Sequence, residues 1–366
     1  MSNKHMPHDL AQMQSLPLKA KIIMTQQRIR QWHEYWDGEV YVSFSGGKDS
    51  TVLKHIVDGM YSDVPALFVN TGLEYPEIQA FVREIKAGKY DCFNSDVEIV
   101  RPEMRFDEVI KKYGYPVISK EVSQQLHEVS QSAKLHNIPK RETNPWKRKF
   151  SDTGKYVSNK SMFSMKKWDF MNDAPFLASH MCCKVMKKKP AYTFEKQTNR
   201  KPFVGTLADE SRLRRTEWIK NGCNAFENKR PRSAPLSFWT EQDILHYIKE
   251  YNVPYCPVYG DIVIDEKVDG ENVLEGQMNM IDYLGCHTQE DKLKTTGCDR
   301  TGCVYCAFGC HLDRTPNRFQ RLKETHPRQY EYCIGGGEYN EEGKWQPSKE
   351  GLGLGKVLEY IGVDYE

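Results

Sequence analysis

A seven-residue stretch, Ser45–Thr51, combines side chains and glycines that suit phosphate binding. It reads SGGKDST and follows a short apolar run, Val40–Phe44, that predicts a buried strand. Apolar residues return at helical spacing up to Val57, so a helix is expected to begin at the loop. Paired glycines let backbone N–H groups approach an anion, and a helix N-terminus favours negative charge. Since Lys48 adds a positive charge, the sequence predicts a phosphate cradle between a strand and a helix.

Cysteines form the second group of residues that could carry chemistry. Five of the eleven cysteines fall between residues 286 and 310, and disulfides are not expected in a chain of cytoplasmic type. The Cys303–Cys306 spacing, Cys-x-x-Cys, lets two thiolates from one turn reach one metal centre. The adjacent pair Cys182 and Cys183 is the natural source of two more ligands, so a centre with four cysteines is predicted.

The other cysteines leave the identity of this centre open. Cys298, Cys303, Cys306 and Cys310 could alone supply four sulfurs, and His311 could replace one of them. Such a local set would favour Zn²⁺. Alternatively, Cys298 or Cys310 is a free thiol beside an iron–sulfur cluster and carries sulfur.

Composition restricts the class of protein and its partners. No stretch of eighteen apolar residues is present and the N-terminus does not resemble a signal peptide, so we expect a cytoplasmic protein without a membrane partner. The net charge is only +2, but residues 134–232 hold 24 Lys and Arg against 9 Asp and Glu. This excess, with Trp146 and Trp168 among the basic residues, suits a nucleic acid partner or a solvated basic face that frames a nucleotide.

Hydrophobic periodicity predicts strands that alternate with helices. Strands are expected at 40–44, 66–72, 97–101 and 202–207, and helices at 16–36, 51–57, 76–87, 104–113, 240–250 and 317–333. Thr240 is expected to cap its helix. This alternation predicts an α/β fold with a parallel sheet whose ligands bind at the carboxyl ends of the strands.

The chain is expected to divide into four segments. They are a helical segment at 1–36, a nucleotide-binding α/β domain at 37–260, a hairpin insertion at 261–296 with a turn at Asp269–Gly270, and a cysteine-rich, mostly helical extension at 297–366 that binds the cluster. Residues 134–175 are polar, basic and rich in turns, which predicts a surface excursion within the second segment.

Four segments in order resemble the phosphoadenosine-phosphosulfate reductase-like proteins. They are SGGKDST at 45–51, FVNTGLEYPE at 68–77, GTLADESR at 205–212, and PLSFWTEQDI at 235–244 followed by VPY at 253–255. The first also resembles the pyrophosphate-binding loop of N-type ATP pyrophosphatases, which cleave ATP between the α- and β-phosphates. The resemblance covers roughly residues 38–260 and implies a Rossmann-like adenine nucleotide alpha-hydrolase fold.

The resemblance also implies where a nucleotide and a cluster would bind. The implied nucleotide-binding residues are Ser43, Ser45, Gly46, Gly47, Lys48, Asp49, Ser50, Thr51, Val69, Asn70, Thr71, Gly72, Gly205, Arg212 and Arg215. Lys48, Asp49 and Arg212 are the expected catalytic residues. The cluster-containing adenylylsulfate reductases have a similar cysteine arrangement, which implies [4Fe–4S] ligands at Cys182, Cys183, Cys303 and Cys306.

Within the family, the sequence departs from the sulfonucleotide reductases. Those enzymes usually have a degenerate loop and use a cysteine in a C-terminal Glu-Cys-Gly-x-His element, whereas here Cys333 lies in YCIG. The intact loop resembles the ATP-using branches, including the DNA-phosphorothioation protein. The main hypothesis is therefore an ATP pyrophosphatase that uses Mg²⁺ and adenylates an acceptor for sulfur transfer.

Two other functions stay open at this point. A sulfonucleotide reductase would form sulfite with Cys333 as its nucleophile, and a non-catalytic protein would sense nucleotide or redox state through the same residues. The partners compatible with the main hypothesis are an adenine nucleotide, a nucleic acid at residues 134–232, and a second copy or a sulfur-transfer protein.

Overall fold

The computed structural model describes residues 4–94, 96–151, 165–265 and 291–366. These residues form two compact units, which we describe separately. Unit 1 comprises residues 1–69, 74–100 and 193–301, and unit 2 comprises residues 70–73, 101–192 and 302–366, as far as they are described. Among the described residues, no helix has the length and apolar character needed to cross a membrane.

A six-stranded sheet forms the centre of unit 1. Its strands, in spatial order, are β3 Val97–Val100, β2 Ala66–Val69, β1 Val40–Ser43, β5 Lys201–Val204, β7 Arg232–Ser233 and β6 Asn224–Ala225. All neighbouring strands are parallel except β6 and β7. The four predicted strands all lie in this sheet, and the predicted α/β fold class is confirmed.

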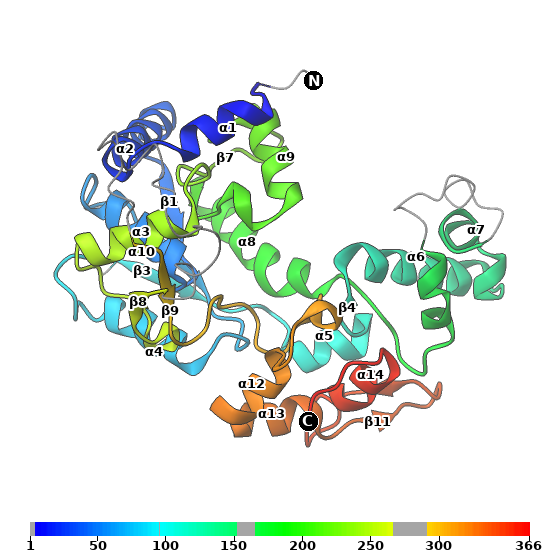
Figure 1. The fold of residues 1–366 in the computed structure, drawn as a ribbon. Coiled ribbons are helices and arrows are strands. Elements are labelled where there is room, and N and C mark those ends of the chain that lie inside the picture. Colours follow the sequence, from blue (N-terminus) through cyan, green and yellow to red (C-terminus); the bar gives the residue numbers. More distant parts are fainter. Residues whose placement is uncertain (1–3, 95, 152–164, 266–290) are drawn as a thin grey trace, which may run out of the picture. The chain divides into compact units, whose positions relative to one another are not determined.

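Helices and two further strands complete unit 1. They are α1 Pro7–Gln14, α2 Leu18–Tyr35, α3 Lys48–Asp58, α4 Pro76–Lys86, α9 Arg212–Asn221, α10 Glu241–Glu250, and the antiparallel pair β8 Ile262–Ile264 and β9 Leu293–Thr295. Figure 1 shows α3 and α10 next to each other beside the sheet, and the two helices are in contact. The turn expected at Asp269–Gly270 lies outside the described residues.

Polar side chains connect helix α2 to the start of helix α10. Thr240 caps α10 as predicted: its hydroxyl accepts a hydrogen bond from the Asp243 amide at 3.2 Å. Asp243 also accepts from the buried Lys21 ammonium of α2 at 2.7 Å. The Trp239 indole N–H donates to Thr25 on α2 at 2.9 Å. These contacts join the N-terminal helix α2 to a segment more than two hundred residues away.

Unit 2 is mostly helical. Its elements are α5 Phe106–Tyr113, β4 Val117–Ile118, α6 Lys120–His136, α7 Asn144–Lys149, β10 Ala307–Phe308, α12 Arg318–Thr325, α13 Pro327–Ile334, β11 Glu338–Tyr339, β12 Trp345–Gln346 and α14 Leu354–Tyr360, with short 3₁₀ turns at 140–142, 166–173 and 310–312 and a π-helical turn at Lys184–Lys188. Helix α8 Lys189–Thr198 carries the chain from unit 2 into unit 1.

Two features of unit 2 differ from the sequence prediction. The single helix expected at 317–333 is wrong, because His326 and Pro327 divide it into α12 and α13. Proline lacks the N–H needed within a helix and is accommodated at the start of a new one. Helix α6 was not predicted, although it has a Ser119 cap whose hydroxyl accepts from the Val122 amide at 3.1 Å.

The centre of the sheet is the most sensitive part of unit 1. Phe203 on β5 is 0% exposed, whereas Leu213 on α9 is 82% exposed. We expect Phe203→Ala to lower the free energy of unfolding by about 3–5 kcal/mol, because it removes a buried ring and leaves a cavity. The matched Leu213→Ala should change it by less than about 0.5 kcal/mol. Denaturant unfolding followed by circular dichroism measures both, and equal losses would contradict this account of the core.

Candidate functional site

The Ser45–Thr51 loop lies at the point where the strand order of the sheet changes direction. From β1 the chain proceeds to β2 and β3 on one side, and later to β5 and β7 on the other. The loop follows β1, and Gly205 follows β5. Open parallel sheets bind ligands in the crevice outside the carboxyl ends of such strands. The topology therefore places the predicted cradle where a ligand would enter.

Two glycines allow the loop to lie close to its neighbours. Gly46 has φ +73°, and a Cβ there would lie 2.8 Å from the Ile78 Cγ2 atom of α4. A Cβ on Gly205 would lie 2.9 Å from the Ser50 Cα atom, which is backbone and cannot rotate away. Glycine at position 205 lets the backbone after β5 lie directly against the first turn of α3.

Hydroxyl groups hold the shape of the loop. Ser45 and Ser50 place their Oγ atoms 3.0 Å apart, and the Ser45 amide donates to Ser50 Oγ at 3.2 Å. Ser50 and Thr51 both donate to the Gly47 carbonyl, at 2.9 and 3.0 Å. These bonds fix the turn before α3, so the loop is organised by its own side chains.

Lys48 is 5% exposed and its polar groups contact oxygens of three distant residues. Its ammonium donates to the Asp299 carbonyl at 2.8 Å and lies 2.9 Å from Glu241 Oε1. Its backbone N–H donates to the Tyr259 hydroxyl at 3.1 Å. The ammonium also lies 5.4 Å from the centre of the Tyr259 ring, within the range of a cation–π contact. Both donors that could bind a phosphate are thus engaged within the chain.

Asp49 is a buried carboxylate in a mixed field of charges. Burial raises the pKa of Asp49, and Glu241 acts in the same direction, while Lys48, Arg300 and Arg214 oppose the rise. Its Oδ1 atom is buried without a hydrogen-bond partner among the described residues. An oxygen in this situation is suited to a cation or a donor group.

The predicted nucleotide-binding residues other than the two arginines fall into two groups. The loop residues, Ser43 at the end of β1 and Gly205 lie together in unit 1. Val69 ends β2, and residues 70–72 follow it as two tight turns in which Asn70 accepts from Gly72 and Thr71 accepts from Leu73.

The predicted arginines are arranged differently from the expectation. Arg212 and Arg215 are exposed on the first turn of α9. Arg214 instead lies within electrostatic reach of Asp49 and makes an ion pair with Glu210. The carboxylate of Glu210 also lies 3.9 Å from Arg300. The guanidinium groups nearest the loop are therefore Arg214 and Arg300.

Several residues of the site were missed by sequence reasoning. Tyr259, Glu241 and Asp299 reach the loop from more than 190 residues away, so local pattern carries no signal for them. Arg300 adjoins the cysteine motif and was not considered as a loop residue. Local pattern also carries no signal that favours Arg214 over its neighbours, because its interaction with Asp49 arises from the tertiary fold.

Four of the cysteines of unit 2 line one largely apolar pocket. It is lined by Leu73, Phe106, Pro116, Cys182, Cys183, Met186, Lys187, Cys303 and Cys306. The Sγ atoms of Cys182 and Cys183 lie 3.9 Å apart, just before the π-helical turn. The structure thus brings the four predicted ligands together, whereas Cys310 is buried outside this lining and Cys298 belongs to unit 1.

The electrostatics of the pocket favour a thiolate. The hydrogen bond with Cys182 lowers the pKa of Cys183, burial opposes this shift, and Lys120, Lys187 and Lys188 lower the pKa further. The same hydrogen bond and burial raise the pKa of Cys182. Across the described ranges, no three His, Cys, Asp or Glu side chains converge closely enough to hold a single metal ion.

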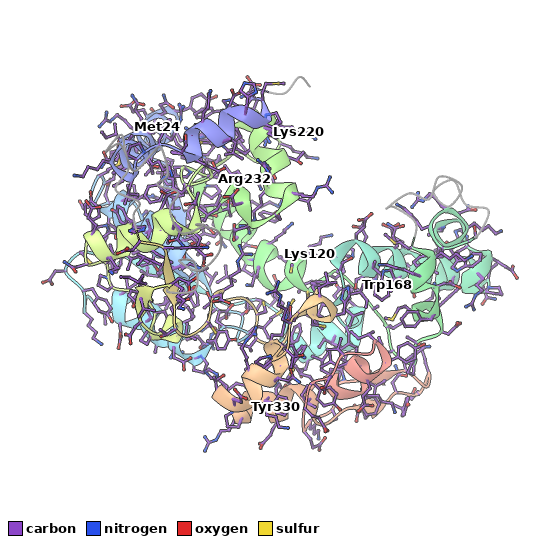
Figure 2. All side chains as sticks on the ribbon, viewed as in Figure 1. Met24, Lys120, Trp168, Lys220, Arg232 and Tyr330 are labelled. Carbon is purple, nitrogen blue, oxygen red and sulfur yellow. The ribbon has the colours of Figure 1, made fainter. Side chains whose placement is uncertain are left out.

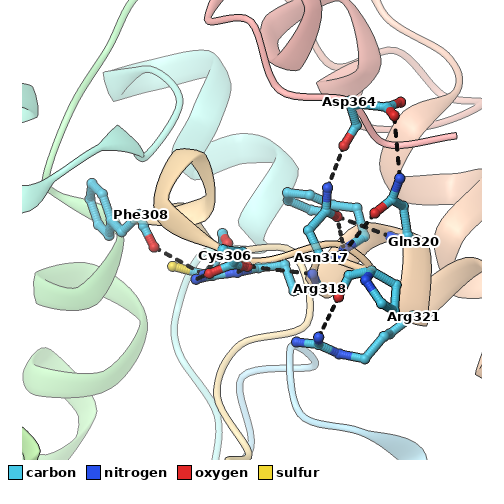
Figure 3. A network of polar contacts seen from close by, with 10 residues as sticks. Cys306, Phe308, Asn317, Arg318, Gln320, Arg321 and Asp364 are labelled. Carbon is cyan, nitrogen blue, oxygen red and sulfur yellow. Dashed lines mark hydrogen bonds and ion pairs between the residues drawn. The ribbon is translucent and has the colours of Figure 1, made fainter.

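Arg318 fixes the segment that carries the Cys-x-x-Cys motif. Figure 3 shows its guanidinium at the Cys306 and Phe308 carbonyls, with distances of 3.0 and 2.9 Å. Asp313 holds the same guanidinium at 2.7 and 2.9 Å. In the same network, Asn317 donates to the Asp364 carbonyl near the C-terminus. The backbone at Cys306 is therefore clamped by an arginine on α12.

Several of the basic residues between 134 and 175 are paired with acids. Arg141 donates to both carboxylate oxygens of Asp173, and the Trp146 indole donates to Asp169 at 2.6 Å. Trp168 and Lys120, both labelled in Figure 2, belong to the same unit. The nucleic acid surface expected here stays a prediction, but fewer of its charges are available than composition suggested.

The described units are therefore a mostly parallel α/β unit with a glycine-rich loop between β1 and α3, and a mostly helical unit with a cysteine pocket. The phosphoadenosine phosphosulfate reductase domain matches residues 39–308, and the chain belongs to this family. This match includes the loop, Gly205 and all four cysteines that line the pocket.

Two individual proteins are also similar to this chain. An uncharacterized protein of Methanocaldococcus jannaschii, MJ0973, is 34% identical over 91 residues, which span 24% of this chain and 21% of that protein. The crystal structure of phosphoadenylyl-sulfate (PAPS) reductase from Candida auris, a phosphate complex, aligns with 70% of this chain and 90% of its own, with 16% identity and a TM-score of 0.36. Neither similarity is extensive enough to assign an activity.

The raised pKa of Asp49 predicts how the free energy of unfolding depends on pH. The folded protein binds this proton more tightly than the unfolded chain does, so stability is lost as pH rises from the ordinary carboxyl range through the raised pKa. We expect Asp49→Asn to raise the denaturation midpoint at neutral pH and to lose this advantage below pH 4.

Denaturant unfolding at several pH values measures this difference, and Asp209→Asn at an exposed position is the control. A constant difference between Asp49→Asn and the wild type at every pH would contradict the assignment.

Proposed function

We propose that this protein is an ATP pyrophosphatase that adenylates an acceptor, with a cysteine-bound cluster that serves sulfur transfer. The observation that carries the proposal is the intact loop, where the Lys48 ammonium and amide are held at the carboxyl end of β1. Membership of the phosphoadenosine phosphosulfate reductase family supports a reaction on an adenine nucleotide.

The loop residues have roles that follow from their charge and position. The ATP phosphates would lie on the amides at the start of α3, where the helix dipole favours them. Lys48 would neutralise charge as the acceptor oxygen attacks the α-phosphorus and pyrophosphate leaves. Arg214 and Arg300 are the guanidinium groups best placed to assist, and Arg212 is adjacent on the same helix.

Mg²⁺ is part of this proposal. The Oδ1 atom of Asp49 has no hydrogen-bond partner among the described residues and is a hard oxygen ligand of the kind that Mg²⁺ prefers. The ion would be bound by this carboxylate and by the substrate phosphates, and it would supply neutralisation of phosphate charge.

The alternative reductase reaction is less well supported. Its candidate nucleophile, Cys333, is 0% exposed in unit 2, and burial raises the pKa of its thiol. A cysteine nucleophile needs access and thiolate character. Cys333 therefore has the properties of a packed core residue, and this favours the ATP-dependent reaction.

The cysteine pocket has the number and kind of ligands that a [4Fe–4S] cluster requires. Four cysteines line one pocket whose other lining residues are mostly apolar. Iron–sulfur clusters of this type are held by four cysteine thiolates. We propose Cys182, Cys183, Cys303 and Cys306 as the ligands, and the cluster would supply redox or sulfur-transfer chemistry.

Replacement of Lys48 tests the reaction directly. We expect Lys48→Ala to lower pyrophosphate release from ATP by a factor of about 100 or more, because it removes a charge that acts in the transition state. Lys249→Ala on the exposed face of α10 is the matched control and should retain the wild-type rate. Sulfite formed from phosphoadenylylsulfate, with no pyrophosphate from ATP, would sink the proposal in favour of the reductase.

Metal analysis tests the cluster independently of activity. Protein purified without oxygen should contain about four iron and four sulfide per chain. Cys306→Ser should lose most of this iron, whereas Cys92→Ser, at an exposed position of unit 1, should retain it. Colourless protein with one zinc per chain would show that the centre is a different one.

A further inference from the structure

The chain itself supplies the oxygens that surround Lys48. The Tyr259 hydroxyl accepts from the Lys48 amide, and the Asp299 carbonyl and Glu241 carboxylate bind the ammonium. An amide and an ammonium at a helix N-terminus are the donors that a bound phosphate would use. Three oxygens of the chain therefore already contact the donors that a bound phosphate would use.

Two of these oxygens depend on one short segment, residues 297–301, which we name the strap. Asp299 is within it, and its last residue, Thr301, has its Oγ1 atom 2.7 Å from the Tyr259 hydroxyl. Backbone hydrogen bonds hold its beginning: the Gly297 amide donates to Tyr259 at 2.9 Å and the Cys298 amide donates to Val258 at 3.0 Å. The strap and Tyr259 thus form a single hydrogen-bonded assembly on the loop.

The strap also restricts the space above the glycines. A Cβ on Gly47 would lie 3.1 Å from Thr301 Oγ1 and 3.2 Å from the Tyr259 hydroxyl. The Lys48 amide already donates to the Tyr259 hydroxyl at 3.1 Å, so it is not available to a phosphate while that hydroxyl stays in place. Phosphate binding at this amide therefore requires the Tyr259 hydroxyl to leave it.

We propose that the strap is a built-in competitor of the polyphosphate, which must displace it from the Ser45–Thr51 loop. This inference rests on the proposed function, because it assumes that the loop binds the phosphates of a nucleotide. The Tyr259 hydroxyl and the Asp299 carbonyl are neutral acceptors, and charged phosphate oxygens bind an ammonium and an amide more strongly. A ligand with several charged oxygens can therefore replace them.

The residue that follows the strap has room to change its backbone conformation. Gly302 follows Thr301, and a Cβ built there meets no atom within 4 Å. The amides of residues 297 and 298 donate the two backbone bonds to Tyr259 and Val258 described above, and the Thr295 hydroxyl donates to the Cys298 carbonyl at 3.2 Å. Apparent affinity for a ligand falls with the fraction of protein whose site is closed, so the strap should weaken the binding of small anions most.

Pyrophosphate binding to the full-length protein tests the strap. Tyr259→Phe keeps the ring beneath Lys48 and removes the competing hydroxyl. We expect it to bind inorganic pyrophosphate about fivefold to tenfold more tightly in isothermal titration calorimetry. In the wild type, the ligand must first break the hydrogen bond between the Lys48 amide and the Tyr259 hydroxyl. Tyr255→Phe is the control, because the Tyr255 hydroxyl donates to Gly260 and does not touch the loop.

Hydrogen exchange gives a second measurement. The amides of Gly297 and Cys298 should exchange faster when pyrophosphate is added, because displacement of the strap strains their hydrogen bonds to Tyr259 and Val258. A ligand that merely covered an unmoved strap would slow this exchange. Mass spectrometry of the peptide that contains residues 293–301 distinguishes the two results.

The outcomes separate this inference from the proposed function. If the wild type binds pyrophosphate and Tyr259→Phe binds it equally or more weakly, or if exchange in the strap slows, the strap is not a competitor and the proposed function stands. If neither protein binds pyrophosphate or ATP, both ideas are overturned.

Discussion

The first turn of α3 lies directly against the backbone that follows β5, with no side chain between them. A Cβ on Gly205 would lie 2.9 Å from the Ser50 Cα atom and 3.0 Å from the Ser50 nitrogen. Because both neighbours are backbone atoms, rotation of a side chain cannot relieve such a contact. This close approach fixes the loop at the crevice between β1 and β5 and fixes the direction in which Lys48 and Asp49 project from α3.

That position has an electrostatic consequence. Lys48 is buried at the N-terminus of a helix, where the helix dipole already carries positive charge. A buried ammonium there needs negative charge. The chain provides the Glu241 carboxylate, whose side chain is 54% exposed, the neighbouring Asp49 carboxylate, whose pKa burial raises, and otherwise neutral oxygens. Asp49 also keeps an oxygen without a hydrogen-bond partner in the described part of the chain.

Sequence patterns predicted those parts of the structure that depend on local spacing. The four strands, the helix after the loop and the Thr240 cap follow from periodicity and from residue types at helix ends. The division of α12 from α13 was missed because an apolar pattern continues across a proline that begins a new helix. Contacts across 211 and 251 residues, from Lys48 to Tyr259 and to Asp299, leave no trace in local pattern and arise only from the tertiary fold. The cysteine pocket was accessible to prediction because its ligand spacing is itself the signal, although the identity of the bound group is still a prediction.

The loop and the cysteine pocket are linked by the chain itself. Thr301 contacts Tyr259 at the loop, and Cys303, two residues later, lines the pocket. The pocket end of this segment is held firmly, because Arg318 binds the Cys306 and Phe308 carbonyls and β10 pairs with β4. Between these two positions, Gly302 is uncrowded. If a polyphosphate displaces the strap, rotation at Gly302 can absorb the movement, and the cysteines proposed as ligands then keep their places while the proposed nucleotide site opens.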